Sequence, residues 1–216
     1  MLADRPTRRF PLASLPPALM LAAGLLGCSI PFQIPVKPGQ PVAEIDGAFA
    51  AGQYIAVSDQ PTAEEFGTLK ADYGVTTVIN LRSHKEMDRL ANPAVDSDAE
   101  PLDQPALMEE LGLEYHHIPL GGDDGYEPAD LAEFARIIDA WEKDRGWLGG
   151  RILIHCASGG RARAMWAAYL IEHRDYSPAE ADRIIRTLGQ EPSAQEKLLG
   201  RELTPRLGKR LPGGSD

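Results

Sequence analysis

The sequence predicts an α/β fold in which a mainly parallel central sheet of four or five strands is flanked by helices. Two observations support this prediction. Short runs rich in β-branched residues alternate with longer amphipathic segments, which is the pattern of strands joined by helices. The run at 152–154 is apolar throughout, as expected of a strand covered on both faces. We expect a single domain over residues 43–190, followed by a C-terminal tail at 191–216.

The first half of the domain is expected to supply three strands, at 53–57, 75–81 and 114–118. The second of these is strongly β-branched and is placed in the middle of the sheet, whereas the first is placed at an edge. Helices are expected at 61–73 and 104–111, whereas the irregular, acidic segment 84–104 is expected to be a surface loop, with or without a short helix at 84–90. Acidic residues in the first turn and Gly74 after the last turn support the first of these helices.

The second half begins with a helix at 129–144. Its apolar side chains recur on one side, at Leu131, Phe134, Ile137, Ile138 and Trp141. A second helix follows the apolar strand and a loop of small residues, and it runs to about His173. Ser177 as N-cap and Pro178 in the first turn open a third helix. A short helical segment is expected around 193–200.

A cysteine, a turn of small residues and an arginine stand between the apolar strand and the next helix: Cys156, Ala157, Ser158, Gly159, Gly160 and Arg161. A turn over a helix N-terminus points backbone N–H groups inward, at the positive end of the helix dipole. Such a cup binds a tetrahedral anion and favours a thiolate, which makes the cysteine a nucleophile. Arg161 would add a bidentate donor to the anion. The alternative for Cys156 is a buried structural cysteine.

The segment His155-Cys156-x-x-Gly159-x-Arg161 resembles the signature loop of the cysteine-dependent tyrosine and dual-specificity phosphatases. It is especially similar to the bacterial phosphatase-like domain of beta-lactamase-hydrolase-like proteins, whose loop is His-Cys-Ala-Ser-Gly-Asn-Arg. The resemblance covers about residues 43–190, through Ser58-Asp-Gln-Pro61, Val78-Ile-Asn-Leu-Arg82 and Tyr115-His-His-Ile-Pro-Leu120. It implies a phosphatase-like single domain that hydrolyses phosphotyrosine, in a protein, or another phosphomonoester through a phosphocysteine on Cys156.

The resemblance also implies a proton-donating aspartate about thirty residues before the cysteine. Asp123 and Asp124 lie at about that spacing, in the Gly-rich acidic loop 121–128, and either is a candidate general acid. The alternative for the pair is a solvated turn. We expect His155 to support the loop and Arg163 to line its rim, unless Arg163 is only a cation on the helix surface.

The loop departs from the usual phosphatase pattern in its length. Arg161 follows the cysteine after four residues rather than five, and Ala162 stands where the arginine usually falls. This spacing is similar to that of the rhodanese-type sulfurtransferases, and a smaller cup favours a single sulfur atom over a phosphate. Two alternatives therefore stay open: a rhodanese-like sulfurtransferase with a persulfide on Cys156, and a non-catalytic anion-binding lipoprotein.

The composition and the remaining motifs exclude several partners. The net charge is −10 and the isoelectric point about 5.0, whereas a nucleic-acid binder needs a basic face. The sequence contains no dinucleotide fingerprint and no P-loop, so we predict no cofactor. His116 and His117 point to opposite faces of a strand, so we predict no metal site.

A phosphate site in so acidic a chain must be a local positive pocket. Arg82 leaves the end of the strand at 75–81 and would either add positive potential there or form a structural ion pair. Ligands of open α/β sheets bind beyond the carboxyl ends of the strands. We therefore expect residues 80–82, the loop 121–125 and Cys156 to converge on one edge of the sheet.

Residues 1–27 resemble a bacterial signal peptide of the lipoprotein type. Arginines precede an apolar stretch at 18–27 that is too short to span a bilayer as a helix. Leu25-Leu-Gly-Cys28 resembles the lipobox, which implies lipidation of Cys28. The proline-rich segment 28–42 is expected to be an extended tether. We expect a lipid anchor on the periplasmic side of the cell envelope, and Ser29 favours the outer membrane.

We predict that Cys28→Ala releases the protein from the membrane fraction, because the acyl chains that hold it there attach to this thiol. Fractionation of cells that express wild type or Cys28→Ala, followed by immunoblotting, measures the change. Unchanged membrane retention of Cys28→Ala would contradict the lipid anchor. Wild-type protein that is itself absent from the membrane fraction would favour a plain cleaved signal.

Overall fold

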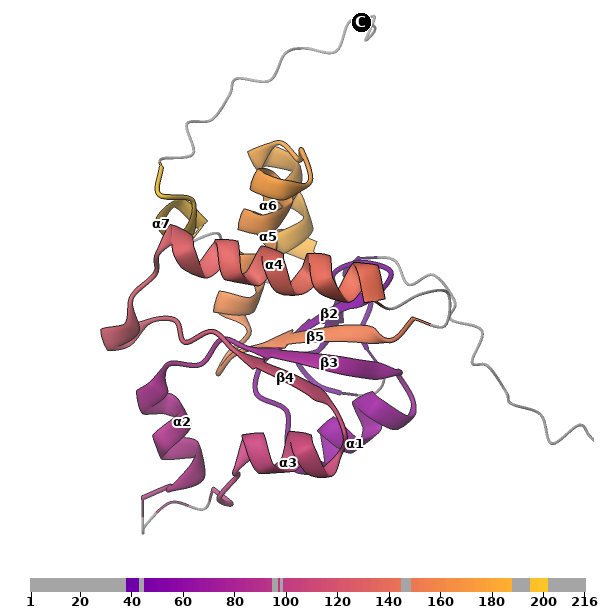
Figure 1. Cartoon of the computed structure of the whole chain (residues 1–216), viewed down its shortest axis with the longest axis vertical. Coiled ribbons are helices and arrows are strands. Elements are labelled where there is room, and N and C mark those ends of the chain that lie inside the picture. The colour runs from indigo at the N-terminus through magenta and orange to yellow at the C-terminus, as the bar shows by residue number, and fades with distance from the viewer. Residues whose placement is uncertain are drawn as a thin grey trace, which may run out of the picture. The chain divides into compact units, whose positions relative to one another are not determined.

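The computed structural model describes residues 38–42, 45–94, 97, 99–144, 149–187 and 195–201. They form one α/β unit around a five-stranded sheet (Figure 1). The strands are β1 (Phe49–Ala50), β2 (Ile55–Ser58), β3 (Val75–Asn80), β4 (Glu114–His117) and β5 (Arg151–His155). Their order is β1-β2-β5-β3-β4, and every neighbouring pair is parallel except β1 with β2. The predicted fold class is confirmed.

The helices cover both faces of the sheet. They are α1 (Ala63–Ala71), α2 (His84–Ala91), α3 (Gln104–Glu110), α4 (Pro128–Asp144), α5 (Gly160–His173), α6 (Pro178–Thr187), α7 (Gln195–Leu199) and the 3₁₀ turn η1 (Gly122–Asp124). Figure 1 shows α4 to α7 on one side of the sheet and α1 and α3 on the other. Helix α2 follows the carboxyl end of β3 directly, so it stands beside the edge where the site is expected.

The central strand β5 is buried on both faces because its side chains alternate between two cores. Ile152 and Ile154 pack with residues of α4, α5, α6 and α7. Leu153 points the other way and packs with Phe66 of α1 and Met108 of α3. The continuous apolar run at 152–154 therefore reflects two helix layers, as the sequence predicted.

One strand lies elsewhere than predicted. Strand β2 was expected at an edge, but it pairs with β5 on one side and with β1 on the other. That prediction is wrong because β1 has only two residues, Phe49 and Ala50. So short a strand carries no alternation that a sequence pattern can detect, and only its pairing with β2 reveals it.

The packed unit uses residues on both sides of the predicted domain. Val42 is fully buried, and the Gly39 N–H donates to the Ala50 carbonyl. At the other end, Leu198 of α7 is fully buried in the core that α4 and α5 share. Cys28, the predicted signal and most of the predicted tether lie outside the described residues.

The described part of the chain contains no helix that is both long and apolar enough to cross a membrane. Across the same described ranges, no three His, Cys, Asp or Glu side chains gather in an arrangement that could hold a metal ion.

Candidate active site

Four strands end side by side at one edge of the sheet. Their last residues, Ser58, His155, Asn80 and His117, are aligned by the pairing register. The segments that leave these strands therefore start along the same edge. Cys156 and the sequence from Leu81 to Glu86 are among them, and the Leu81 N–H donates to the His155 carbonyl. The structure thus brings the predicted strand-end residues to one edge.

Cys156 is fully buried between β5 and the N-terminus of α5. The N-cap of α5 is Gly159, whose side chain cannot cap the helix, so its first backbone N–H groups have no side-chain acceptor there. The φ of Gly159 is 75°, and a Cβ at this position would lie 2.9 Å from an Arg163 guanidinium nitrogen. The positive φ favours glycine, and a side chain here would displace the Arg163 guanidinium. The turn thus leads directly into the N-terminus of α5, the kind of helix end that can bind an anion.

Arg161 is held by three hydrogen bonds on one side of its guanidinium. Its two terminal nitrogens donate to the Glu86 carboxylate, at 2.6 Å and 2.7 Å, and Nη1 also donates to the Leu120 carbonyl at 2.5 Å. A guanidinium has five N–H groups, so Nε–H and one Nη2–H stay available. These two groups lie next to each other and form the second bidentate edge. Burial would lower the pKa of Arg161, but its interactions with Glu86 and with Cys156 raise it. Cys156 therefore lies close to this guanidinium.

Glu86 is the partner that the sequence gave no reason to choose. Burial would raise its pKa, but hydrogen bonds from Arg161 and Ser83 outweigh that effect and lower the pKa from 4.5 to about 2. The same carboxylate accepts the Ser83 backbone N–H at 2.9 Å and closes the capping box that starts α2. Glu86 is therefore ionised at neutral pH and joins α2 to Arg161.

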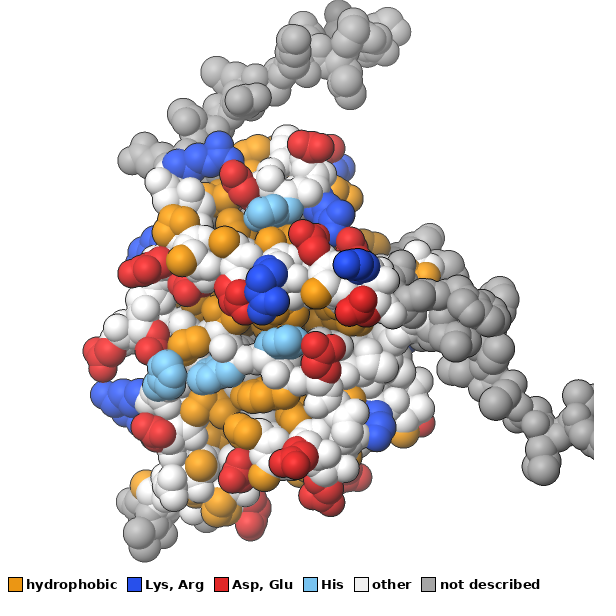
Figure 2. Space-filling view, in the orientation of Figure 1, with side chains coloured by type: hydrophobic (Ala, Val, Ile, Leu, Met, Phe, Trp, Pro, Cys, Tyr) orange, Lys and Arg blue, Asp and Glu red, His pale blue; other side chains and the backbone are white. Residues whose placement is uncertain are grey.

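Two further guanidinium groups lie close enough to Cys156 for their charges to interact with it. Arg82 donates to Gln60 Oε1 at 3.2 Å and to the Glu86 carbonyl at 3.3 Å. Burial lowers the pKa of both Arg82 and Arg163. The cysteine thus has three guanidinium groups near it, those of Arg82, Arg161 and Arg163, within an acidic protein. On the face of the protein seen in Figure 2, acidic and basic side chains are interspersed.

Arg163 lies below the turn rather than on the helix surface. Only 8% of its surface is exposed. Its guanidinium packs against Gly159 and stands 5.7 Å from the centre of the Phe49 ring. It also interacts electrostatically with Asp59, the residue after β2. This placement suits a support for the loop better than the predicted contact at its rim.

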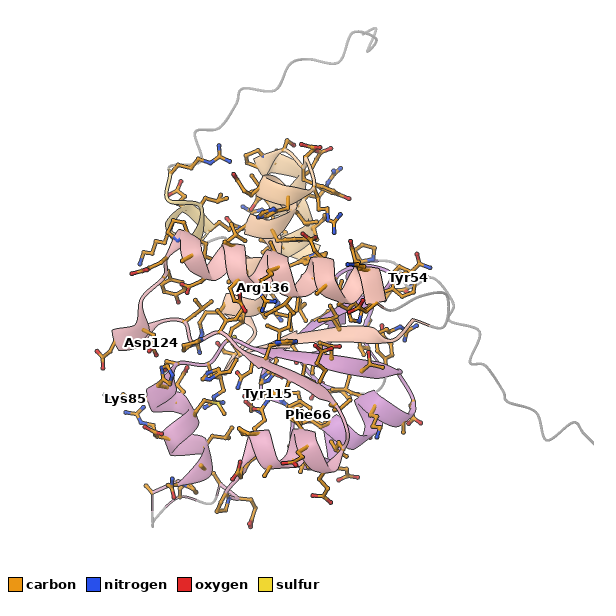
Figure 3. All side chains as sticks on the ribbon, in the orientation of Figure 1. Tyr54, Phe66, Lys85, Tyr115, Asp124 and Arg136 are labelled. Atoms are coloured by element: carbon orange, nitrogen blue, oxygen red, sulfur yellow. The ribbon has the colours of Figure 1, made fainter. Side chains whose placement is uncertain are left out.

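The two candidate acids lie on the loop that touches Arg161, and Asp124 pairs with His84 at the start of α2. Asp124 Oδ2 accepts the His84 backbone N–H at 2.9 Å, and Oδ1 is 2.7 Å from His84 Nδ1. The His84 side chain and backbone lower the pKa of Asp124 through these hydrogen bonds. Figure 3 shows Asp124 beside the start of α2, close to Lys85. Asp123 is exposed. The contact of this loop with Arg161 comes from Leu120 and Gly121 instead.

His155 is fully buried behind the cysteine, and burial above all lowers its pKa to about 3. It is therefore neutral and supports the loop from below. His117, at the end of β4, donates from Nε2 to the Arg82 carbonyl at 2.7 Å, and His116 pairs with Glu114. The two neighbouring histidines thus have separate partners.

Sequence reasoning missed Glu86 and Gln104, which contact Arg161 and His155. The capping-box pattern Ser83-x-x-Glu86 was a usable signal for the start of α2. No local signal shows that the same carboxylate reaches a residue 75 positions away.

No family model matches the chain. Two beta-lactamase hydrolase-like proteins of Xylella fastidiosa, from strains Temecula1 and 9a5c, are 34% identical to it over 113 residues. The match covers 52% of this chain and 22% of each of those proteins, so the chain spans about a fifth of the length of these curated relatives.

Several solved phosphatase structures have the same fold. Tk-PTP in its active form gives a TM-score of 0.56 at 21% identity, over 73% of this chain and 99% of that one. TpbA of P. aeruginosa gives 0.55 at 18%, over 76% and 90%. PTPMT1 in complex with PI(5)P gives 0.54 at 20%, over 71% and 92%. The chain therefore has the fold of the tyrosine and dual-specificity phosphatases, the superfamily that residues 155–161 resemble.

Proposed function

We propose that this protein is a cysteine-dependent phosphatase that hydrolyses phosphotyrosine or another phosphomonoester. One observation carries the proposal: Cys156 lies at the uncapped N-terminus of α5 and close to Arg161, whose second bidentate edge is not used by Glu86. That arrangement supplies a nucleophile and donors for a phosphoryl group in one place. The fold shared with solved phosphatases supports it. With Cys28 lipidated, the enzyme would act at the cell envelope.

In the first step the Cys156 thiolate attacks phosphorus in line with the leaving oxygen. The S–P bond forms as the P–O bond of the ester breaks, and the leaving oxygen takes that electron pair. The N–H groups of residues 157–160 and the Nε/Nη2 edge of Arg161 hold the equatorial oxygens as their charge grows. In the second step water attacks phosphorus, the S–P bond breaks, and the thiolate and inorganic phosphate are released.

The leaving oxygen needs a proton in the first step, and the attacking water loses one in the second. The loop that contacts Arg161 through Leu120 carries Asp123 and Asp124, so we infer that this side of the site exchanges both protons. Asp124 acts with His84, whose hydrogen bonds favour the ionised carboxylate and suit the base of the second step.

The four-residue spacing between Cys156 and Arg161 keeps a sulfurtransferase as the second candidate. Such an enzyme would carry a persulfide on Cys156 and would not use a general acid. An assay of sulfur transfer from thiosulfate to cyanide therefore belongs beside every phosphatase assay.

We predict that purified protein hydrolyses p-nitrophenyl phosphate and that Cys156→Ser abolishes this activity. Arg161→Ala should lower kcat/KM roughly 10²–10³-fold, because it removes a charged donor to the developing transition state. The matched control is Arg136→Ala, whose side chain is 64% exposed and pairs with Glu133 along the same helix; it should keep wild-type activity. Hydrolysis by Cys156→Ser, or thiosulfate activity in place of phosphatase activity, would reject the proposal.

We predict that removing the proton-exchanging carboxylates slows hydrolysis by a factor that depends on the leaving group. At least one of three variants should hydrolyse phenyl phosphate roughly 10²–10⁴-fold more slowly than wild type. The variants are Asp123→Asn, Asp124→Asn and the double variant. The loss should be smaller with 2,4-dinitrophenyl phosphate, whose leaving group departs without a proton. Asp139→Asn, on the exposed side of α4, is the control. Wild-type rates in all three variants would remove both aspartates from the mechanism.

We predict that Glu86→Gln lowers both activity and stability, because Arg161 loses its charged partner. The activity loss should be on the order of tenfold or more. The pKa of Glu86 is lower in the folded protein than in the unfolded chain, so its stabilisation is present above about pH 4.5 and is lost as the pH falls towards 2. Urea unfolding at a series of pH values should therefore show the two proteins converging at low pH. An equal difference at every pH would contradict this, and Glu133→Gln is the exposed control.

A further inference from the structure

A chain of buried amide side chains lies behind the cysteine and ends on His155. Gln104, the first residue of α3, is fully buried, as are Asn80 and His155. Gln104 Nε2 is 2.7 Å from His155 Nε2. An imidazole nitrogen can donate or accept, so this contact has two possible polarities. The neighbours of Gln104 decide between them.

The first constraint comes through Asn80. Its Oδ1 accepts the backbone N–H of Arg82 at 2.9 Å, and a backbone N–H can only donate. The amide of Asn80 is therefore oriented, and its Nδ2 points the other way. That nitrogen donates to Tyr115 Oη at 2.9 Å and to Met87 Sδ at 3.0 Å, and it faces Gln104 Oε1 at 3.4 Å. Asn80 thus presents a donor to Gln104.

The second constraint comes independently through Gln60. Its Oε1 accepts from Arg82 Nη1 at 3.2 Å, and its Nε2 donates to the Pro61 carbonyl at 2.9 Å. Both partners have only one possible role, so the Gln60 amide is oriented as well. The same Nε2 faces Gln104 Oε1 at 3.4 Å. Two donors therefore converge on one atom of Gln104 and identify it as the oxygen.

The polarity of the last contact follows. If Oε1 of Gln104 faces Asn80 and Gln60, then its NH₂ group faces His155, and an amide NH₂ only donates. His155 Nε2 must accept, so the proton of the neutral ring is on Nδ1. Nδ1 is buried and has no hydrogen-bond partner among the described residues, and the backbone of Cys156, the next residue, interacts with it electrostatically. A donor therefore faces the peptide of the cysteine.

We propose that Gln104 is a positioning residue that holds His155 as the Nδ1–H tautomer and thereby presents a hydrogen-bond donor to the Cys156 peptide. The opposite tautomer would place a lone pair there and would repel the peptide carbonyl. The donor holds the turn in the conformation that points its N–H groups at the substrate phosphate. The effect on catalysis rests on the proposed phosphatase function, whereas the tautomer itself does not.

The charges around His155 favour the neutral ring, as burial does. Arg82, Arg161 and His117 all disfavour a positive ring, in addition to burial. His155 therefore stays neutral through the working range of pH, and its role is to orient rather than to exchange protons. Arg82 also donates to both amides that orient Gln104, through its backbone N–H to Asn80 and through Nη1 to Gln60. The position of Arg82 thus determines which atoms donate and which accept along the path from Arg82 to His155.

The test is a nitrogen-15 NMR measurement of the histidine side chains in the full-length protein, assigned with His155→Asn. We expect His155 to show a protonated Nδ1 and an unprotonated Nε2, with no titration between about pH 5 and 8. Gln104→Met keeps the length of the side chain and removes the donor, so the bias should be lost. Gln104→Glu places a carboxylate beside Nε2 and should reverse the tautomer. Wild-type His155 with its proton on Nε2 would overturn the proposal.

The functional arm uses the same variants. Gln104→Met should lower kcat for p-nitrophenyl phosphate about tenfold, which corresponds to about 1.4 kcal/mol. It should also slow the alkylation of Cys156 by iodoacetamide, which is measured by mass spectrometry of the peptide that contains this cysteine. Gln53→Met, at an exposed glutamine, is the control and should change neither rate. Equal alkylation and turnover in Gln104→Met and wild type would reject the positioning role.

The two proposals fail in different ways. A protein without phosphatase activity, in which Gln104→Met still shifts the tautomer and slows alkylation, would retain the positioning role and reject the phosphatase. An active phosphatase with an Nε2–H His155 would do the reverse. Circular dichroism and thermal melting of each variant identify any loss that comes from misfolding.

Discussion

A guanidinium has two edges that can hold pairs of oxygens, and the ion pair between Arg161 and Glu86 decides which edge is left for the substrate. Glu86 and the Leu120 carbonyl occupy three of the five N–H groups. Cys156 lies close to the same guanidinium. Because Glu86 also closes the capping box of α2 through Ser83, one carboxylate both starts a helix and orients the arginine. The site is therefore preorganised by the same contact that completes the fold around it.

Arg82 connects the charged pair Arg161–Glu86 to the uncharged amides of Gln60 and Asn80. Its guanidinium reaches the Glu86 carbonyl and Gln60, its N–H reaches Asn80, and its carbonyl accepts from His117. Buried polar groups are costly unless they are paired, and each of these contacts satisfies one. A hydrogen-bonded network of this kind has few alternative arrangements. It can therefore hold a small loop in one conformation without a metal or a disulfide among the described residues.

The sequence predicted the features that depend on short-range pattern. The apolar run before Cys156, the small residues of the turn and the following helix are neighbours in the chain, so their order alone indicates an anion cup. It could not predict that Asp124 would bond to His84, or that Arg163 would turn inward below Gly159. In both cases the partner comes from another element: His84 of α2 for Asp124, and Phe49 of β1 for Arg163. The prediction that β2 is an edge strand was also wrong, because its neighbour β1 is too short to show a pattern in the sequence.

By itself, the sequence determined the fold class and the position of the turn at 155–161, with Gly159 where the backbone has a positive φ. These features follow from the hydrophobic period and from local conformational preference. The tertiary structure alone decided the partners of the functional groups: Glu86 for Arg161, Gln104 for His155 and His84 for Asp124. These pairs join residues 75, 51 and 40 positions apart. Hydrogen bonds and ion pairs act over a few ångströms, so such pairs exist only after the packing of the sheet and its helices has brought the residues together.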